Sequence, residues 1–263
     1  MPEPSSVKTS IKPTISLITA VYNNEAFIGS ALASAQAQDY PNIEHIIVDG
    51  GSTDRTLEIL ETNRDRIAKL ISEPDEGIYD ALNKGIKAAT GKYIAFLHSD
   101  DIFEHSSALS NLVKQIEATD SEFSCSDVLI VEQHSEKIIR FYRSNFFREW
   151  LFKLGWMPPH PGCLYEKALH DEFGLYSTRF KIAGDFDFLV RVFFGRKIKW
   201  TYTNQVTMKM RRGGLSNAGF ASKRLIAKEL AEALKVNGVS ASPALQLLRY
   251  PIRLLEMVMR PKT

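Results

Sequence analysis

Two adjacent aspartates, Asp100 and Asp101, follow the largely apolar run at residues 93–98. Like charges held this close repel each other and resist leaving water, so the pair is costly at the end of a buried strand. A divalent cation relieves that cost, and ligands made only of oxygen favour Mg²⁺ or Mn²⁺ over zinc. A cation held by so few protein ligands commonly serves the phosphates of a substrate. The alternative is that one aspartate caps the next helix.

The acidic pair is one of four polar clusters that each follow a predicted strand. The apolar runs at residues 14–19, 43–48, 68–72 and 93–98 predict strands, and a helical pattern follows each of them. Such alternation builds a parallel sheet with helices on both faces, so the predicted fold class is α/β. Ligands of open sheets bind beyond the carboxyl ends of the strands. We therefore expect all four clusters to line a single crevice.

The order of these clusters resembles family 2 glycosyltransferases of the GT-A fold. The segments read TAVYN at residues 19–23, VDGGSTD at 48–54, DEGIYDALNKG at 75–85 and SDD at 99–101. The resemblance runs from about residue 14 to residue 216 and is greatest to bacterial enzymes of exopolysaccharide and lipopolysaccharide assembly, of the colanic acid type. It implies a Rossmann-like, mainly parallel sheet flanked by helices. It also implies inverting transfer of a sugar from a nucleotide diphosphate sugar, with UDP as the expected nucleotide.

The nucleotide side is expected in the first half of the chain. Asp49 can accept a hydrogen bond from a base N–H, and the glycines after it let the backbone approach a flat ligand. The resemblance implies that Asp49 meets the uracil ring, whereas the alternative is ordinary turn chemistry. Lys84 can offset diphosphate charge or pair with Asp80 on the same helix face. The predicted nucleotide-binding residues are Thr19, Tyr22, Asn23, Asp49, Asp75, Asn83, Lys84 and Ser99.

The resemblance also implies the metal ligands. It places Asp100 on the cation, with Asp101 in support, and the expected cofactor is Mn²⁺ or Mg²⁺. The commoner family pattern has an aspartate two positions before the metal ligand, where this chain has His98. That histidine contacts the ribose or the metal shell in one interpretation and is a structural residue in the other.

The catalytic base is expected in the second half. Residues 184–191, GDFDFLVR, resemble the family block Glu-Asp-Tyr-Asp-x-x-x-Arg, with Gly184 in place of the glutamate. The resemblance assigns the base to Asp185. Inverting transfer requires such a carboxylate to take the acceptor's proton, and a metal to stabilise the leaving diphosphate. The alternative for Asp185 is a helix cap, and Asp187 is structural or faces the acceptor. His160 is expected to face the same cavity.

Residues 208–217 form a predicted basic loop after the last strand. Arg211 and Arg212 lie beside paired glycines and can clamp a diphosphate once the loop closes. The alternative is a basic run on the surface.

The chain is predicted to hold one catalytic domain and a tail. Residues 1–220 form the domain, with a nucleotide-sugar half at about 14–105 and an acceptor half at about 106–220. Residues 221–263 form a helical extension in which eight Lys/Arg face three Glu, with a break expected at Pro251. Such a basic amphipathic segment binds a membrane surface or docks on the domain, and both interpretations stay open.

Composition excludes several functional classes. The net charge of +2 argues against a nucleic-acid binder, and two cysteines are too few for a disulfide framework. Residues 1–12 have no apolar core, so we expect no signal peptide and a cytoplasmic enzyme, with a peripheral position on the inner face of the plasma membrane as the option that the tail leaves open. The expected partners are a nucleotide-sugar donor and a glycan or lipid-linked acceptor. Two other classes compete with this interpretation: a nucleotidyltransferase, which should carry a glycine-rich first loop, and a non-catalytic sugar-nucleotide binder.

Overall fold

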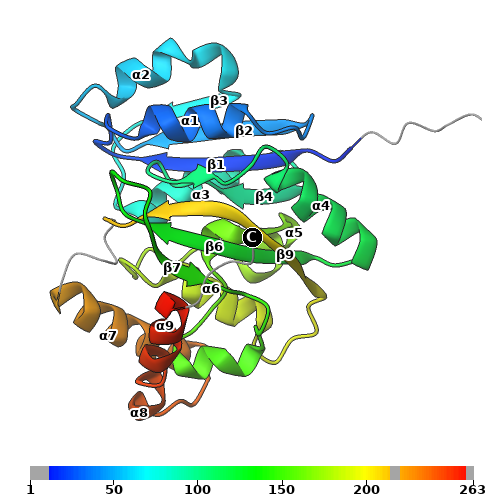
Figure 1. Ribbon diagram of the computed structural model, residues 1–263, viewed down its shortest axis with the longest axis vertical. Coiled ribbons are helices and arrows are strands. Elements are labelled where there is room, and N and C mark those ends of the chain that lie inside the picture. Colours follow the sequence, from blue (N-terminus) through cyan, green and yellow to red (C-terminus); the bar gives the residue numbers. More distant parts are fainter. Residues whose placement is uncertain (1–11, 214–219, 259–263) are drawn as a thin grey trace, which may run out of the picture.

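The computed structural model describes residues 12–213 and 220–258. Its centre is a nine-stranded sheet in the order β3-β2-β1-β4-β8-β6-β9-β5, with β7 paired to β6 (Figure 1). The strands are β1 (Ile15–Val21), β2 (Ile43–Asp49), β3 (Lys69–Ser72), β4 (Tyr93–Phe96), β5 (Ile102–Phe103), β6 (Phe123–Val131), β7 (Ile138–Tyr142), β8 (Cys163–Glu166) and β9 (Trp200–Arg211).

The first four strands are parallel, as the sequence predicts. β1 pairs with β2 and β4, and β2 pairs with β3, all in the same direction. The crossovers between them carry α1 (Ile28–Gln36), α2 (Thr56–Thr62) with a 3₁₀ turn at Arg64–Arg66, and α3 (Ile78–Ala88). The α/β class is therefore confirmed, and the carboxyl ends of these strands lie at one edge of the sheet.

The second half is mixed in direction. β8 runs antiparallel to β4 and β6, whereas β9 runs parallel to β6. The pairing of β6 with β9 continues to the register of Val131 with Arg211. The expectation of a loop from residue 208 is therefore wrong, because residues 208–211 complete a strand. The helices of this half are α4 (Ala108–Thr119), α5 (Ala168–Phe173) and α6 (Gly184–Phe193), with 3₁₀ turns at Glu149–Leu154 and His160–Gly162.

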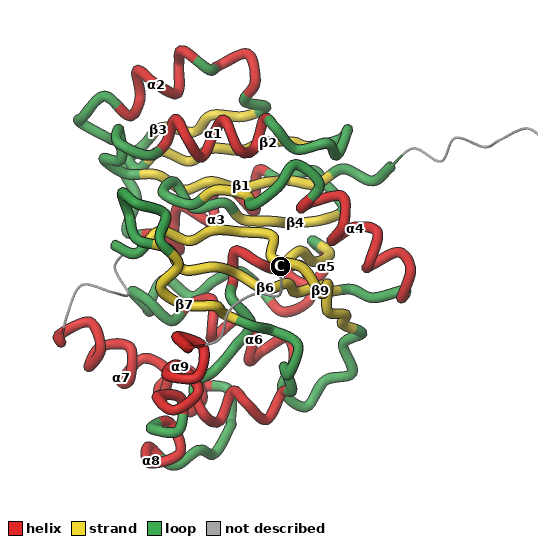
Figure 2. The backbone as a smooth tube through the Cα atoms, viewed as in Figure 1, coloured by secondary structure: helices red, strands yellow, loops and turns green. Residues whose placement is uncertain are grey.

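The sheet buries both of its faces under helices (Figure 2). In β1, Ile15 and Leu17 pack into the cluster that holds residues of α1 and α4. Ile18 and Ala20 of the same strand point the other way, into the cluster formed with α3 and α6. This alternation is what a strand buried on both faces requires, since successive side chains point to opposite sides.

Helix α7 (Phe220–Val236) belongs to the same core. Its Leu230, Ala233 and Leu234 are buried in the cluster that contains Phe186 and Leu189 of α6. The division of the chain near residue 220 therefore does not correspond to a division of the core. The first part of the expected tail is a docked helix.

The last two helices, α8 (Pro243–Gln246) and α9 (Arg249–Val258), lie at the end of the molecule away from α2 (Figure 1). The helical segment is interrupted between Gln246 and Arg249 and not at Pro251. Pro251 falls in the first turn of α9, where proline is tolerated. Arg249 and Glu256 are 3% and 2% exposed, and Glu256 accepts a hydrogen bond from Arg140 at 2.5 Å. The charged side of α9 thus faces the protein.

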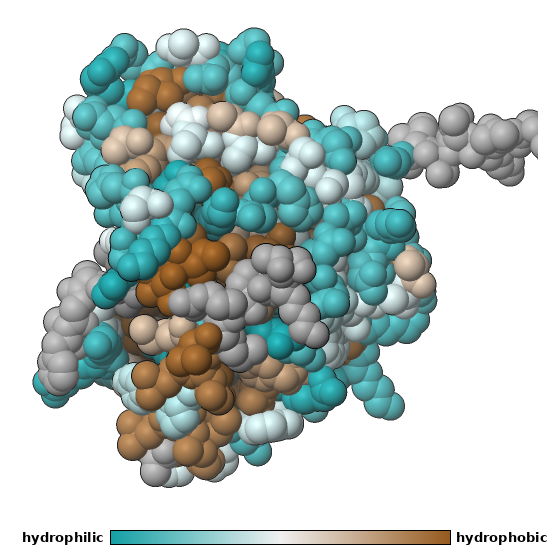
Figure 3. Space-filling view, viewed as in Figure 1, coloured by the Kyte–Doolittle hydropathy of each residue, from teal (hydrophilic) through white to brown (hydrophobic). Residues whose placement is uncertain are grey.

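Apolar side chains of α9 face outward instead. Leu254 and Leu255 are each 64% exposed and Val258 is 81% exposed. Figure 3 shows hydrophobic surface gathered over α8 and α9. At Arg249 the basic side of the helix is turned inward, as the docked interpretation of the tail requires, while Arg260 lies outside the described residues. Within the part of the chain that the structure describes, no helix is long and apolar enough to cross a membrane.

Candidate active site

The loops after β1 and β2 are bound to each other by Asn23. Its backbone N–H donates to Ser52 Oγ, and its side-chain Oδ1 accepts from the Thr53 backbone N–H, both at 2.8 Å. Asn23 has a φ of 46°, in the left-handed region that asparagine tolerates. Asn23 therefore lies just after the carboxyl end of β1, as predicted, and its side chain holds the two loops together.

Asp49 shapes the turn after β2. It is fully buried and accepts from the backbone N–H groups of Gly51 and Ser52 at 3.2 Å and from Ser72 Oγ at 2.8 Å. These contacts show a role in holding the turn. Direct contact between Asp49 and a base stays a prediction.

The surface beside this turn is formed by Tyr22, Gly50 and Asp75. A Cβ added at Gly50 would lie 2.3 Å from Asp75 Oδ2 and 3.4 Å from Tyr22 Cδ2. Tyr22 is 61% exposed, and Asp75 Oδ1 accepts from the Gly77 N–H at 2.8 Å. A flat ligand can thus meet an aromatic ring, a bare backbone and a carboxylate at one place.

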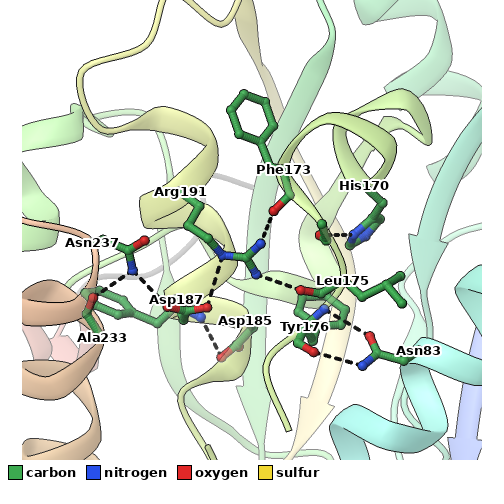
Figure 4. Close-up of polar contacts among 12 residues, drawn as sticks. Asn83, His170, Phe173, Leu175, Tyr176, Asp185, Asp187, Arg191, Ala233 and Asn237 are labelled. Carbon is green, nitrogen blue, oxygen red and sulfur yellow. Dashed lines mark hydrogen bonds and ion pairs between the residues drawn. The ribbon is translucent and has the colours of Figure 1, made fainter. Parts of the chain in front are cut away.

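Three predicted nucleotide contacts point elsewhere. Thr19 is fully buried, with its Oγ1 3.0 Å from His45 Nε2. Asn83 binds the backbone N–H and C=O of Tyr176 at 3.0 and 2.8 Å (Figure 4). Lys84 pairs with Glu73 at 2.9 Å and also donates to the Pro74 carbonyl. We therefore correct the expectation that Thr19 and Asn83 contact the nucleotide directly, because both side chains are buried and bonded within the protein.

The acidic motif is fixed from two sides. Ser99 Oγ accepts from Asn24 Nδ2 at 2.8 Å, which ties the motif to the loop after β1. Asp101 Oδ1 accepts from the Arg211 backbone N–H at 3.1 Å, and Arg211 Nη1 donates to the Asp100 carbonyl at 2.7 Å. Arg211 thus braces the acidic loop from β9, which corrects its expected role as a free diphosphate clamp. Arg212 is exposed at the end of β9, and its role stays a prediction.

The acidic pair fits a divalent cation. Asp101 is 2% exposed, and its Oδ2 is buried with no hydrogen-bond partner among the described residues. Burial, followed by the charge of Asp100, raises the pKa of Asp101 well above its ordinary value. Within the ranges 12–213 and 220–258, no group of three or more His, Cys, Asp or Glu could hold a metal ion. A pair of carboxylates, one of them with an unbonded oxygen, suits a cation whose remaining ligands come from phosphates and water.

Asp185 lies in the first turn of α6, beside Tyr79 of α3. Its Oδ1 accepts from its neighbour's backbone N–H, that of Phe186, at 2.8 Å and from Tyr79 Oη at 3.0 Å. Burial raises the pKa of Asp185 to about 6, although these hydrogen bonds act in the opposite direction. A partly buried carboxylate with a raised pKa is well suited to accept a proton near neutral pH.

His160 does not face an open cavity. It is 4% exposed, stacks on Phe96 with ring centroids 4.4 Å apart, and binds Tyr176 Oη through Nε2 at 2.7 Å. Burial lowers its pKa well below the ordinary value, so the ring is neutral. Its expected position in the acceptor cavity is corrected by this burial. His98 lies closer to the acidic loop, with its ring 6.0 Å from that of His160.

Asp187 is a structural residue. It is 3% exposed and binds Arg191 Nε at 3.2 Å and Asn237 Nδ2 at 2.8 Å. The same arginine donates to the carbonyls of Phe173 and Leu175 (Figure 4). Asp187 thus anchors α6 to the segments around it, and the alternative that it faces the acceptor is not supported.

Two residues at this site were missed by sequence reasoning. Tyr79 lies within a recognised segment, but nothing local indicates that its hydroxyl reaches Asp185, 106 positions away. Glu229 of α7 accepts from three consecutive backbone N–H groups at residues 181–183, immediately before α6. A glutamate in a basic helix carries no signal of that contact.

Comparisons with known proteins identify the family of this chain. The family model described as "Glycosyl transferase family 2" matches residues 16–176. A PGL/p-HBAD biosynthesis glycosyltransferase of Mycobacterium bovis is 29% identical over 210 residues, which are 78% of this chain and 80% of that one. An uncharacterised glycosyltransferase of Mycobacterium tuberculosis is 31% identical over 184 residues, which are 68% of each chain.

Two solved structures share the fold. S. aureus TarS 1-349 in complex with UDP-GlcNAc matches with a TM-score of 0.65 and 22% identity, over 82% of this chain and 66% of that one. Our chain spans 39% of a longer TarS chain. Mannosyltransferase PcManGT from Pyrobaculum calidifontis, in complex with GDP-Man and Mn²⁺, matches with a TM-score of 0.63 and 19% identity, over 94% and 70%.

These structural likenesses support the GT-A architecture that the sheet order indicates. The family model covers more than half of the chain, including the clusters after β1, β2, β3 and β4. The chain therefore belongs to glycosyl transferase family 2 and is a glycosyltransferase.

Proposed function

We propose that this enzyme inverts the anomeric configuration as it transfers a sugar from a UDP-sugar to a hydroxyl group. The acceptor is a glycan or lipid-linked intermediate of cell-surface polysaccharide synthesis. The observation that carries the proposal is Asp185, a carboxylate whose pKa is raised to about 6 at the start of α6. It lies on a different element from the acidic loop, so a base and a phosphate-binding group are supplied separately, as inverting displacement requires.

Asp185 acts as the general base. Both of its side-chain hydrogen bonds in the described chain fall on Oδ1, which leaves Oδ2 to accept the acceptor's proton. A pKa of about 6 makes Asp185 a stronger base than an ordinary carboxylate while keeping it largely ionised at neutral pH. Tyr79 holds the carboxylate orientation through its hydroxyl.

Asp100 and Asp101 would hold the divalent cation. When bound, such an ion offsets the charge that develops on the leaving diphosphate. Arg211 fixes the carbonyl of Asp100 and the carboxylate of Asp101, so the loop is preorganised before the donor arrives. On the nucleotide side, Tyr22, Gly50 and Asp75 form the surface against which a base would lie. The preference for UDP over GDP is part of the proposal.

Calorimetric titration with UDP and with GDP tests the donor site. We expect UDP to bind in Mn²⁺ and to bind much more weakly in EDTA, or in Asp100→Ala with Mn²⁺ present. Asp65→Ala is the matched control, because Asp65 is an exposed acidic residue with 79% side-chain exposure. Equal UDP affinity with and without metal would remove the cation from the proposal, and tighter binding of GDP would reassign the base.

The stereochemical proposal needs a separate measurement. Proton NMR of the first product formed from the UDP-sugar that the enzyme uses as donor should show the anomeric configuration opposite to that of the donor. Retention of configuration would contradict the role of a single base.

We also propose that the outward face of α8 and α9 contacts an anionic membrane surface, where a lipid-linked acceptor would be found. The face combines Leu254, Leu255 and Val258 with Tyr250, whose pKa is lowered mainly by a hydrogen bond from the inward-facing Arg249 and also by the exposed Lys223 of α7. Aliphatic side chains beside an aromatic ring and an exposed cation are typical of helices that lie in the lipid interface.

Co-sedimentation with anionic vesicles tests this contact. The native chain should sediment, and the double variant Leu254→Glu/Leu255→Glu should stay in the supernatant. Val236→Glu on α7 is the control, since Val236 is exposed but lies outside both helices. Because apolar burial carries the binding, added salt should weaken it less than it weakens a purely electrostatic contact. If the native chain does not sediment with vesicles but forms a dimer that the double variant loses, the face binds a second copy of this chain.

A further inference from the structure

Glu229 connects α7 to the turn that carries the proposed base. The residue is 6% exposed, and its carboxylate accepts from the backbone N–H groups of Lys181 and Ile182 at 2.9 Å and of Ala183 at 3.0 Å. Residue 183 is the N-cap position of α6, and no side chain caps this helix locally. Buried backbone N–H groups need acceptors, and here a glutamate from a distant helix accepts from the two residues before this N-cap and from the N-cap itself.

One peptide group is bonded on both of its sides. The Ala183 N–H donates to Glu229, while the carbonyl of the same peptide, that of Ile182, accepts from Tyr79 Oη at 2.6 Å. Tyr79 Oη also lies 3.0 Å from Asp185 Oδ1. The phenol has a single proton, so the Ile182 carbonyl and the Asp185 carboxylate compete for it.

The glutamate biases that competition. An anion that accepts from a peptide N–H polarises the group and makes its carbonyl a stronger acceptor. Glu229 therefore draws the Tyr79 proton toward Ile182 and away from Asp185. The charge of Glu229 also acts on Asp185 directly. Among the described residues, the other titratable groups on which the charge of Asp185 acts include the neutral side chains of Tyr79, Tyr142, Cys163, Tyr165 and Tyr176.

We propose that Glu229 is a positioning residue for the catalytic base, acting through the Ile182–Ala183 peptide and the Tyr79 hydroxyl. The proposal rests on the proposed role of Asp185 for its catalytic meaning. Its physical content is independent of that role, because it concerns how tightly Asp185 holds a proton and where its carboxylate lies. Helix α7 is then part of the catalytic apparatus.

A carbon-13 NMR titration of the Asp185 carboxyl tests the inference without any substrate. The signal is assigned by its loss in Asp185→Asn, and the native midpoint should lie near 6. In Glu229→Gln the midpoint should fall, since the variant removes a negative charge and frees the Tyr79 proton for Asp185. Glu232→Gln is the matched control, because Glu232 lies on the same helix in a partly exposed pair with Arg179 at 3.5 Å. Its titration should coincide with the native one.

Further variants keep the test decisive. In a Tyr79→Phe background, Glu229→Gln should lower the midpoint by less than it does alone, because the relay through the hydroxyl is gone. If Glu229→Gln does not fold, Glu229→Asp is titrated instead, and its shorter side chain should also give a lower midpoint. A native midpoint in the folded Glu229 variant would overturn the inference.

Turnover separates this inference from the proposed function. Glu229→Gln should lower kcat by up to ~10²-fold, the cost of a misplaced catalytic group, with UDP affinity unchanged. Full turnover in Asp185→Asn would refute the base, even where Glu229→Gln still lowers the midpoint. If Asp185→Asn loses turnover while Glu229→Gln keeps the native titration midpoint and the native turnover, only the positioning role is refuted.

Discussion

The nucleotide side and the base side of this enzyme are built in different ways. On the nucleotide side, Asn23 and Asp49 bind turn amides and hydroxyls at most about 30 positions away, directly at the strand ends. On the base side, Asp185 is oriented by Tyr79 from 106 positions earlier, and its turn is held by Glu229 from 46 to 48 positions later. The turns after β1 and β2 are therefore held by contacts between the loops of two neighbouring strands, whereas the base depends on how helices pack.

Replacing the base should give the largest effect and separate the two sides. Asp185→Asn keeps the shape of the side chain but cannot take a proton, so turnover should fall by ~10²–10⁴-fold, the usual contribution of a general base. Steady-state kinetics with the UDP-sugar that the native enzyme uses as donor measures the loss. UDP affinity by calorimetry should be unchanged, because the hydrogen bonds of the Asp185 side chain among the described residues go to Tyr79 and Phe186 and not to the nucleotide side. A parallel loss of UDP binding would mean that the two regions are not independent.

A pair of glycine substitutions sharpens the same comparison. A Cβ at Gly184 would lie 2.8–2.9 Å from three atoms of the Tyr79 ring, which is buried and bonded at its hydroxyl. Because that ring cannot move away, Gly184→Ala should destabilise the fold by ~1–3 kcal/mol, as overpacking does. At Gly50 the contact is instead the end of the partly exposed Asp75 side chain, which can rotate away.

Gly50→Ala should therefore leave stability nearly unchanged and weaken UDP binding. Urea unfolding and UDP calorimetry on both variants measure the contrast. The reverse result, an unstable Gly50→Ala and a stable Gly184→Ala, would contradict the assignment of rigidity to the base side.

The pH dependence of the free energy of unfolding should show a smaller effect, whose direction follows from the raised pKa of Asp185. Burial raises the pKa of Asp185 from 3.8 to about 6 in the folded protein, so the folded state binds a proton more tightly than the unfolded state. The stability that this proton provides is present below the unfolded pKa and is lost as pH rises through the folded pKa. Above about pH 7, Asp185→Asn should therefore be more stable than the native protein, by on the order of 1 kcal/mol.

The same variant should lose most of this advantage at about pH 4, because Asp185 is then protonated and neutral in the folded protein, as the asparagine is. Urea unfolding at the two pH values measures the difference. A variant that is less stable than the native protein at the higher pH would show that the ionised carboxylate is not strained by its burial.

The difference between the two sides also explains what the sequence can predict. The four parallel strands, the acidic pair and the helix at Gly184–Phe193 follow from short-range patterns, and each is present in the structure. Thr19 and Asn83 carry the right chemistry at the right places, but their partners His45 and Tyr176 are fixed only by packing. The inward charged face of α9 also depends on a partner, Arg140 of β7, that periodicity alone cannot reveal.

The position of α9 bears on aggregation. The sheet ends in two short strands, β3 with four residues and β5 with two, which offer little template for an added strand. β7 is longer and pairs on one side only, with β6, but α9 packs against it through Glu256 and Arg140. The last helix thus packs beside the sheet border at which another chain could extend the hydrogen-bond ladder, and we expect it to hinder strand-to-strand association there.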